Sequence, residues 1–139
     1  MNERKAILEK VRLAAWDDRR WVRTFEALES KRFEHLYPIV RGYVRSKFLL
    51  DEGDPEETLI LDLADTSLRK ILRLKKEGKL IGDISRGCSG ASSVISKKVL
   101  LMKAVQEDFH ITLTPTQSAE IQTLDQLTAA ISEQKEGLT

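Results

Sequence analysis

Apolar residues recur every three to four positions along most of the chain, which is the period of a helix with one buried face. The first such stretch is residues 3–16, whose apolar face consists of Ile7, Leu8, Val11, Ala14 and Ala15. The second places Trp21, Val22, Phe25 and Leu28 on one side. In residues 36–50 the apolar side consists of Ile39, Val40, Tyr43, Val44 and Phe48, and Pro38 predicts that this helix begins at the proline.

A strong helix start follows in DEGDPEE, residues 51–57. Asp54 suits the N-cap, Pro55 suits the first helical position, and acidic residues are favoured in a first turn. We therefore predict a linker at 50–54 and a long helix from Pro55 to about residue 77, with Gly78 as its stop. Thr66 leaves open whether this is one helix or two.

Residues 79–93 hold three glycines and four serines and predict a loop. A helix over about 93–108 follows. Thr114 and Pro115 then predict a brief helix through Ile121. Thr123 and Gln126 form a capping-box pattern ahead of a last helix, which carries Leu127, Ala130 and Ile131 on its apolar face.

Composition agrees with an all-α protein, since helix-forming residues dominate and there are only 7 glycines and 3 prolines in 139 residues. No apolar run approaches the ~20 residues that span a bilayer, and the start has no signal-peptide pattern. A single cysteine cannot form an internal disulfide or a multi-thiolate metal site. These features lead us to expect a cytoplasmic protein without a membrane span.

Charge divides the chain into a basic first part and an acidic second part. Residues 1–50 hold 12 Lys and Arg against 7 Asp and Glu, whereas residues 51–139 hold 11 against 15. The basic residues of the first part alternate with Trp and Tyr, as in some nucleic-acid-binding surfaces. The aromatic residues fall at helical spacing, however, so we expect them to be buried and predict no nucleic-acid partner. The first helices would pack on the rest of the chain or pair in a homodimer.

The pattern from residue 90 onward resembles the acyl carrier protein family. That family has a Gly-x-Asp-Ser-Leu motif at the start of its second helix, where this chain has Gly90-Ala91-Ser92-Ser93-Val94. VLLMKAVQEDF, residues 99–109, and ITLTPTQSAEIQTLDQLTAAI, residues 111–131, are similar to the segments that follow the motif in the family. The resemblance covers roughly residues 56–133. It implies an all-α, acyl-carrier-protein-like helical bundle over residues 54–139, with an N-terminal helical extension over residues 1–53.

In function, the resemblance implies a carrier rather than an enzyme. The motif serine, here Ser93, would bear a 4′-phosphopantetheine arm that holds an acyl or aminoacyl group as a thioester, in fatty acid or secondary metabolite biosynthesis. The partners would be a phosphopantetheinyl transferase and a dedicated enzyme that loads or transfers the group. A helix start favours a phosphate through its free N–H groups and dipole. The alternative is a protein–protein interaction module of the same fold without the arm.

The site residues leave alternatives open. Ser93 is equally well an N-cap that satisfies a free N–H. Counting back from Phe109 without a gap places the family's serine position at Ile95, so Ser92 and Ser96 are the fallback attachment sites.

The remaining polar candidates lie on the second helix and in the loop before it. Lys97, Lys98 and Lys103 form either a solvated face or a partner-docking surface. Cys88, near Arg86, is a distant candidate for a nucleophile. His35, His110 and the cysteine have no metal-ligand spacing, so we predict no metal site.

Overall fold

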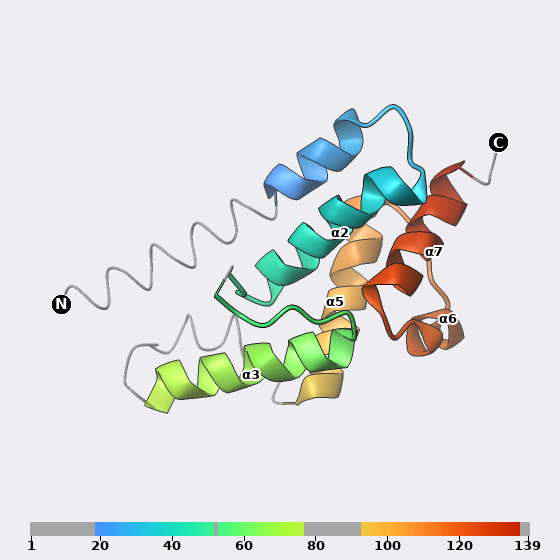
Figure 1. The fold of residues 1–139 in the computed structure, drawn as a ribbon. Coiled ribbons are helices and arrows are strands. Elements are labelled where there is room, and N and C mark those ends of the chain that lie inside the picture. Colours follow the sequence, from blue (N-terminus) through green and yellow to red (C-terminus); the bar gives the residue numbers. More distant parts are fainter. Residues whose placement is uncertain (1–18, 52, 77–92, 137–139) are drawn as a thin grey trace.

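The computed structural model describes residues 19–51, 53–76 and 93–136, and all the regular structure in these ranges is helical (Figure 1). A helix over residues 19–27 is followed by α2 (Phe33–Lys47), α3 (Ile60–Lys76), α5 (Val94–Phe109), α6 (Pro115–Glu120) and α7 (Leu124–Glu136). Helix α2 packs against α7, and α3 packs against α5. The all-α prediction is confirmed for these residues. The predictions for residues 3–16, Gly78, most of the 79–93 loop, Cys88 and Ser92 lie outside them.

The helix of residues 19–27 uses the face that its sequence predicts. Phe25 is buried, and Trp21, Val22 and Leu28 are half-buried against the same core. The indole ring of Trp21 occupies the position that a Cβ atom on Gly42 would take, so the glycine allows this helix to approach α2 closely. The apolar face of residues 19–28 is thus covered within the chain.

The start of α2 differs from the prediction, because the helix begins at Phe33 and continues through Pro38. A proline at this position removes the N–H that would bond to the carbonyl of Glu34 in the first turn. Glu34 and Pro38 are both exposed, so water can satisfy that carbonyl. The predicted apolar side is confirmed, since its five residues, Ile39, Val40, Tyr43, Val44 and Phe48, are all buried.

Helix α3 begins at Ile60, five residues later than predicted, and Asp54 is not its N-cap. The Asp54 carboxylate instead accepts hydrogen bonds from the ammonium of Lys70 at 2.7 Å and from the backbone N–H of Asp51 at 2.8 Å. The buried Arg45 guanidinium donates to the carbonyl oxygens of Asp51, Asp54 and Pro55. Burial of the guanidinium is the main factor that lowers the pKa of Arg45, and the positive charge of Arg41 adds to it. The carboxylates of Asp54 and Asp51 oppose this shift. An arginine stays charged nonetheless.

A second constraint holds the chain extended just before α3. Leu59 and Thr123 form an antiparallel bridge. The N–H of Ile60 donates to the carbonyl of Gln122, and the N–H of Leu124 donates to the carbonyl of Thr58. These bonds pair the entrance of α3 with the entrance of α7. Helix α3 is continuous from Ile60 to Lys76. Of the two alternatives at Thr66, one helix or two, the single helix is therefore confirmed.

The three C-terminal helices begin where the capping signals place them. Ser93 caps α5, and Thr114 and Gln117 form a capping box at α6. The Thr123 hydroxyl accepts from the N–H of Gln126, whose side chain accepts from the N–H of Thr123. The predicted helix start near residue 93, the cap at Thr114 and the capping box of Thr123 and Gln126 are confirmed.

Phe109 lies at the centre of the core. Its fully buried ring makes edge-to-face contacts with Phe25 at 4.7 Å and with Tyr43 at 4.8 Å between centroids. The Tyr43 hydroxyl also donates to the Asp108 carboxylate. One core therefore contains residues from both predicted parts of the chain, 1–53 and 54–139. The boundary between these parts stays a prediction.

We predict that Phe109→Ala lowers the free energy of unfolding by about 3–5 kcal/mol, because it leaves a cavity among three helices. Chemical denaturation followed by circular dichroism measures the change. Phe33→Ala is the matched control, since Phe33 is 39% exposed and contributes chiefly a stacked contact with Tyr37. We expect the control to cost about 1 kcal/mol or less. Equal losses in the two variants would contradict the central role of Phe109.

Lys70→Met should lower the free energy of unfolding by about 1–3 kcal/mol, because it removes charged hydrogen bonds to Asp54 and to the carbonyl of Leu49. The neighbouring Arg69→Met removes an exposed ion pair with Asp65 and should cost no more than about 0.5 kcal/mol. Urea titration of both variants makes the comparison. If Lys70→Met leaves the free energy of unfolding unchanged, the segment around Asp51 and Asp54 is held by other contacts.

Candidate functional site

Ser93 lies exposed at the start of α5 and caps that helix. Its backbone is extended, with φ −135° and ψ 161°. Its hydroxyl oxygen accepts a hydrogen bond from the N–H of Ser96 at 3.1 Å, and the hydroxyl donates to the Ser96 side chain at 2.9 Å. The capping alternative from the sequence is therefore confirmed. Exposure also leaves the hydroxyl accessible from solvent, so a cap and an attachment point are compatible at this position.

The other two serines differ in position. Ser96 lies in the first turn of α5 and is half-buried, with its hydroxyl against Ser93, while Ser92 lies outside the described residues. Ile95, the gapless counterpart of the family's serine, is 68% exposed. Of the two predicted attachment serines that the structure describes, Ser93 is thus the exposed one and lies at the helix start.

The three lysines of α5 do not form one surface. Lys97 is buried, and its ammonium lies over the ring of Phe48 at 5.7 Å from the centroid. Lys98 is half-buried and donates to the carbonyl of Ala119 in α6 at 3.3 Å. Lys103 is exposed. Of the three lysines predicted as a solvated face or a docking surface, Lys98 and Lys103 thus reach the surface, whereas Lys97 is buried.

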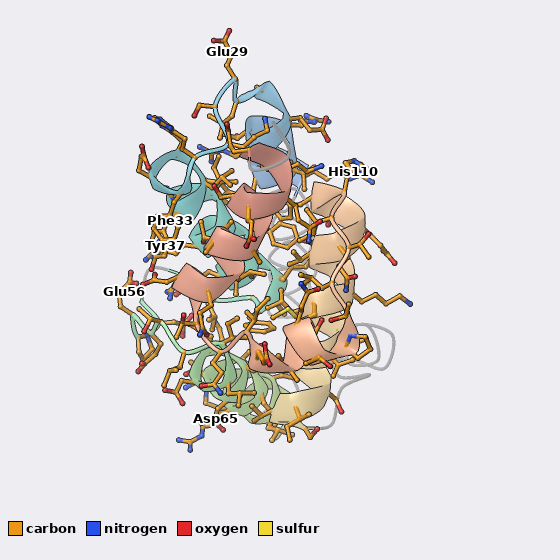
Figure 2. The ribbon with its side chains drawn as sticks, turned by 90° about the vertical axis from the view of Figure 1, so that its right-hand side faces the viewer. Glu29, Phe33, Tyr37, Glu56, Asp65 and His110 are labelled. Atoms are coloured by element: carbon orange, nitrogen blue, oxygen red, sulfur yellow. The ribbon has the colours of Figure 1, made fainter. Side chains whose placement is uncertain are left out.

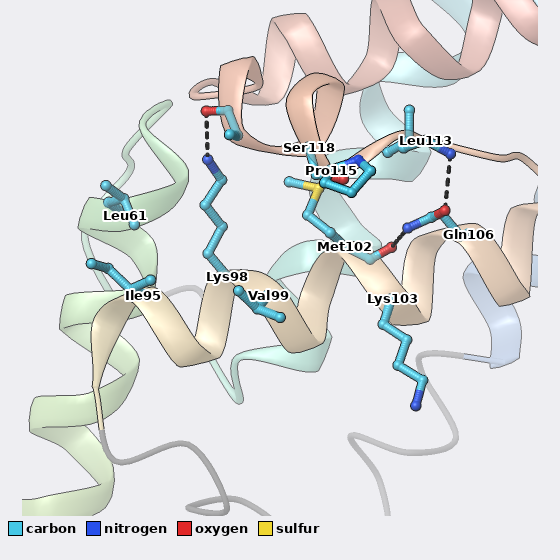
Figure 3. Close-up of a pocket in the computed structure, with 11 residues that line it drawn as sticks. Leu61, Ile95, Lys98, Val99, Met102, Lys103, Gln106, Leu113, Pro115 and Ser118 are labelled. Atoms are coloured by element: carbon cyan, nitrogen blue, oxygen red, sulfur yellow. Dashed lines mark hydrogen bonds between the residues drawn. The ribbon is translucent and has the colours of Figure 1, made fainter.

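An apolar hollow of about 500 Å³ lies between α5, α6 and the start of α3 (Figure 3). Its floor includes Met102 and Leu113, which are buried, and its rim includes Ile95 and Val99, which are more than 60% exposed. The full lining consists of Leu61, Ile95, Lys98, Val99, Met102, Lys103, Gln106, Leu113, Pro115, Ser118 and Ala119. The hollow begins two residues after Ser93.

Two side chains of α5 hold the walls of this hollow in place, as the dashed lines of Figure 3 show. The Gln106 amide donates to the carbonyl of Met102 at 3.2 Å and accepts from the N–H of Leu113 at 2.9 Å. Lys98 links α5 to the last turn of α6 through Ala119. The hollow is thus braced at both ends by hydrogen bonds.

This hollow was not predicted from the sequence, although the residues of α5 carry a signal for it. Apolar residues occur on more of this helix than one face can bury, so Ile95, Val99 and Leu100 remain exposed. A surplus of apolar positions on a helix marks a second contact surface. What the sequence did not reveal is that α6 and Leu61 of α3 complete the wall.

The histidines do not contribute to this site. Ser93 and His110 are the residues at the two opposite ends of α5, and the left-handed backbone of His110 ends the helix. The side chain of His110 lies at the surface (Figure 2). His35 is exposed in the first turn of α2. Across the ranges that the structure describes, no group of three His, Cys, Asp or Glu side chains could hold a metal ion. In the same ranges, no helix combines the length and apolar character needed to cross a bilayer.

No protein-family model, curated protein or solved structure matches this chain. The resemblance to acyl carrier proteins therefore stays a prediction from the sequence.

Ser93→Ala should lower the free energy of unfolding by about 1 kcal/mol, because the N–H of Ser96 loses its acceptor. Ser93→Asn keeps an acceptor at the cap and should stay within about 0.5 kcal/mol of the parent protein. Thermal and urea unfolding of the two variants test this. If both variants lose the same stability, the cap is not the source of the effect.

Proposed function

We propose that the protein is an atypical acyl or aminoacyl carrier protein, whose Ser93 bears a 4′-phosphopantetheine arm and presents a thioester-bound group to a dedicated partner enzyme. The observation that carries the proposal is the exposed Ser93 at the N-cap of the 16-residue helix α5. The order of the described helices supports it, because α3, α5, the short α6 and α7 occur in the order expected for the helices of a carrier bundle.

The residues around Ser93 fit an arm joined through a phosphodiester. The first N–H groups of a helix have no partner within that helix, and its dipole favours negative charge there. Esterified Ser93 could still accept from the N–H of Ser96, although it could no longer donate to the Ser96 hydroxyl. Attachment therefore costs one exposed hydrogen bond and keeps the cap. The arm would supply the thiol on which the carried group travels.

The role of the protein in this proposal is to position rather than to catalyse. Tethering raises the effective concentration of the carried group at the partner's active site. The helix that begins after Ser93 is anchored in the bundle along its length, since Lys97, Leu101, Val105 and Phe109 are buried. The required partners are a phosphopantetheinyl transferase and the enzyme that loads or receives the group.

Intact-mass spectrometry after incubation with coenzyme A and a broad-specificity phosphopantetheinyl transferase tests the proposal. We expect the full chain to gain the mass of one arm. Ser93→Asn should gain nothing while remaining folded, because it keeps the cap and lacks the hydroxyl. Ser96→Ala is the control that should still be modified.

Two outcomes would overturn this assignment. Modification of Ser93→Asn would move the attachment site to another serine, with Ser92 and Ser96 as the next to replace. An unchanged mass in the parent protein, under conditions that modify an unrelated carrier, would remove the arm from the proposal altogether.

A second candidate is an interaction module of the same fold that has no arm. It is favoured by the hydrogen bond that the Ser93 hydroxyl donates to the Ser96 side chain, which an esterified serine could not make. The mass measurement separates the candidates, because the module gains no arm and the carrier does.

A further inference from the structure

The apolar hollow beside α5 combines two features that together suggest its occupant. Its rim residues Ile95 and Val99 project into solvent, with 68% and 62% of their surface exposed. Among the described residues that line it, the ionisable ones are Lys98 and Lys103 and none is acidic. Large exposed apolar side chains rimmed by polar groups mark interaction sites. The lysines add a preference for a partner of negative charge.

We propose that this hollow docks an acidic amphipathic helix of a partner protein. The lining residues of α5 run from Ile95 to Gln106, which corresponds to about 17 Å at 1.5 Å per residue and matches a helix of about three turns. Apolar residues of the partner would lie over Met102 and Leu113. Carboxylates along the edges of the same helix would face Lys98 and Lys103.

The shape of the rim favours a helix over a single aliphatic chain. A helix with its side chains is about 10–12 Å wide, so it can cover Ile95 and Val99, which project from successive turns of α5, and also contact Met102 and Leu113 on the floor. A narrow aliphatic chain on the floor would leave both side chains in water. The hydrogen bonds of Lys98 to Ala119 and of Gln106 to Leu113 hold the walls in place before docking, which lowers the ordering cost of binding.

This inference goes beyond the carrier function, because the surface consists of described residues whether or not Ser93 carries an arm. It also connects with that function, since a partner helix in the hollow would lie next to Ser93. Neighbouring carboxylates at Asp62 and Glu120 follow lining residues in sequence but do not line the hollow themselves. The electrostatic attraction for an acidic partner should therefore be confined to the part of the hollow near Lys98 and Lys103, and it should weaken as the salt concentration rises.

Two synthetic peptides test the proposal. Both carry leucines at i, i+3, i+4 and i+7 of a three-turn helix, and they differ only in having glutamates or lysines along the edges. Fluorescence anisotropy with the full chain should show at least tenfold tighter binding of the glutamate peptide. Amide chemical shifts of ¹⁵N-labelled protein should change around Ile95, Val99 and Met102.

Matched variants locate the binding site. Val99→Glu should weaken binding of the glutamate peptide at least tenfold, since Val99 lines the hollow. Leu100→Glu is the control, because Leu100 is 52% exposed on the same helix but does not line the hollow. The double variant Lys98→Glu, Lys103→Glu should reverse the preference and bind the lysine peptide better.

Several results would overturn the proposal. These are no binding of either peptide, equal binding of both, or equal sensitivity to Val99→Glu and Leu100→Glu. Palmitate binding at Val99 without peptide binding would assign the hollow to a small amphiphile instead. Concentration-dependent dimerisation abolished by Val99→Glu, measured by light scattering, would assign it to a second copy of the chain. A missing arm on Ser93 would leave the peptide results unaffected, so the two proposals fail separately.

Discussion

The packing of Phe109 between Phe25 and Tyr43 is the contact on which the arrangement of the chain depends. These three rings come from α5, the helix of residues 19–27 and α2, which are distant in sequence. These ring contacts hold the C-terminal end of α5 in place. The Tyr43 hydroxyl of α2 also donates a hydrogen bond to the Asp108 carboxylate of α5. The N-terminal helix and α2 are thus part of the core that orients α5.

The orientation of α5 determines which of its residues are buried and which are exposed to a partner. Its buried face includes Lys97, Leu101, Val105 and Phe109, which recur every four residues. Ile95 and Val99 fall just outside this face, and they remain exposed beside the hollow. The same rotation separates the lysines, because the ammonium of Lys97 lies over the ring of Phe48, whereas Lys98 and Lys103 are among the residues that line the hollow. The surface of this helix therefore carries less positive charge than its three lysines suggest.

The late start of α3 has a comparable effect on the site. The bridge between Leu59 and Thr123 and the bonds around it bring the entrance of α3 to the entrance of α7. Leu61, in the first turn of α3, consequently reaches the hollow beside Ile95. A helix starting at Pro55 would leave no extended segment for this pairing.

The sequence by itself determined the features whose physical causes are local. The caps at Ser93, Thr114 and Thr123 were predictable because each bonds to a residue three positions away. The buried faces of α2 and of the 19–27 helix followed from helical periodicity in the same way. The helix starts predicted from Pro38 and Asp54 were wrong, because at both positions the surroundings in the fold decided the outcome. Pro38 is tolerated because the first turn of α2 is exposed, and Asp54 binds Lys70, 16 residues away, instead of capping a helix. Only the tertiary structure decided the hollow, because its walls come from three helices and their distances depend on packing in the core.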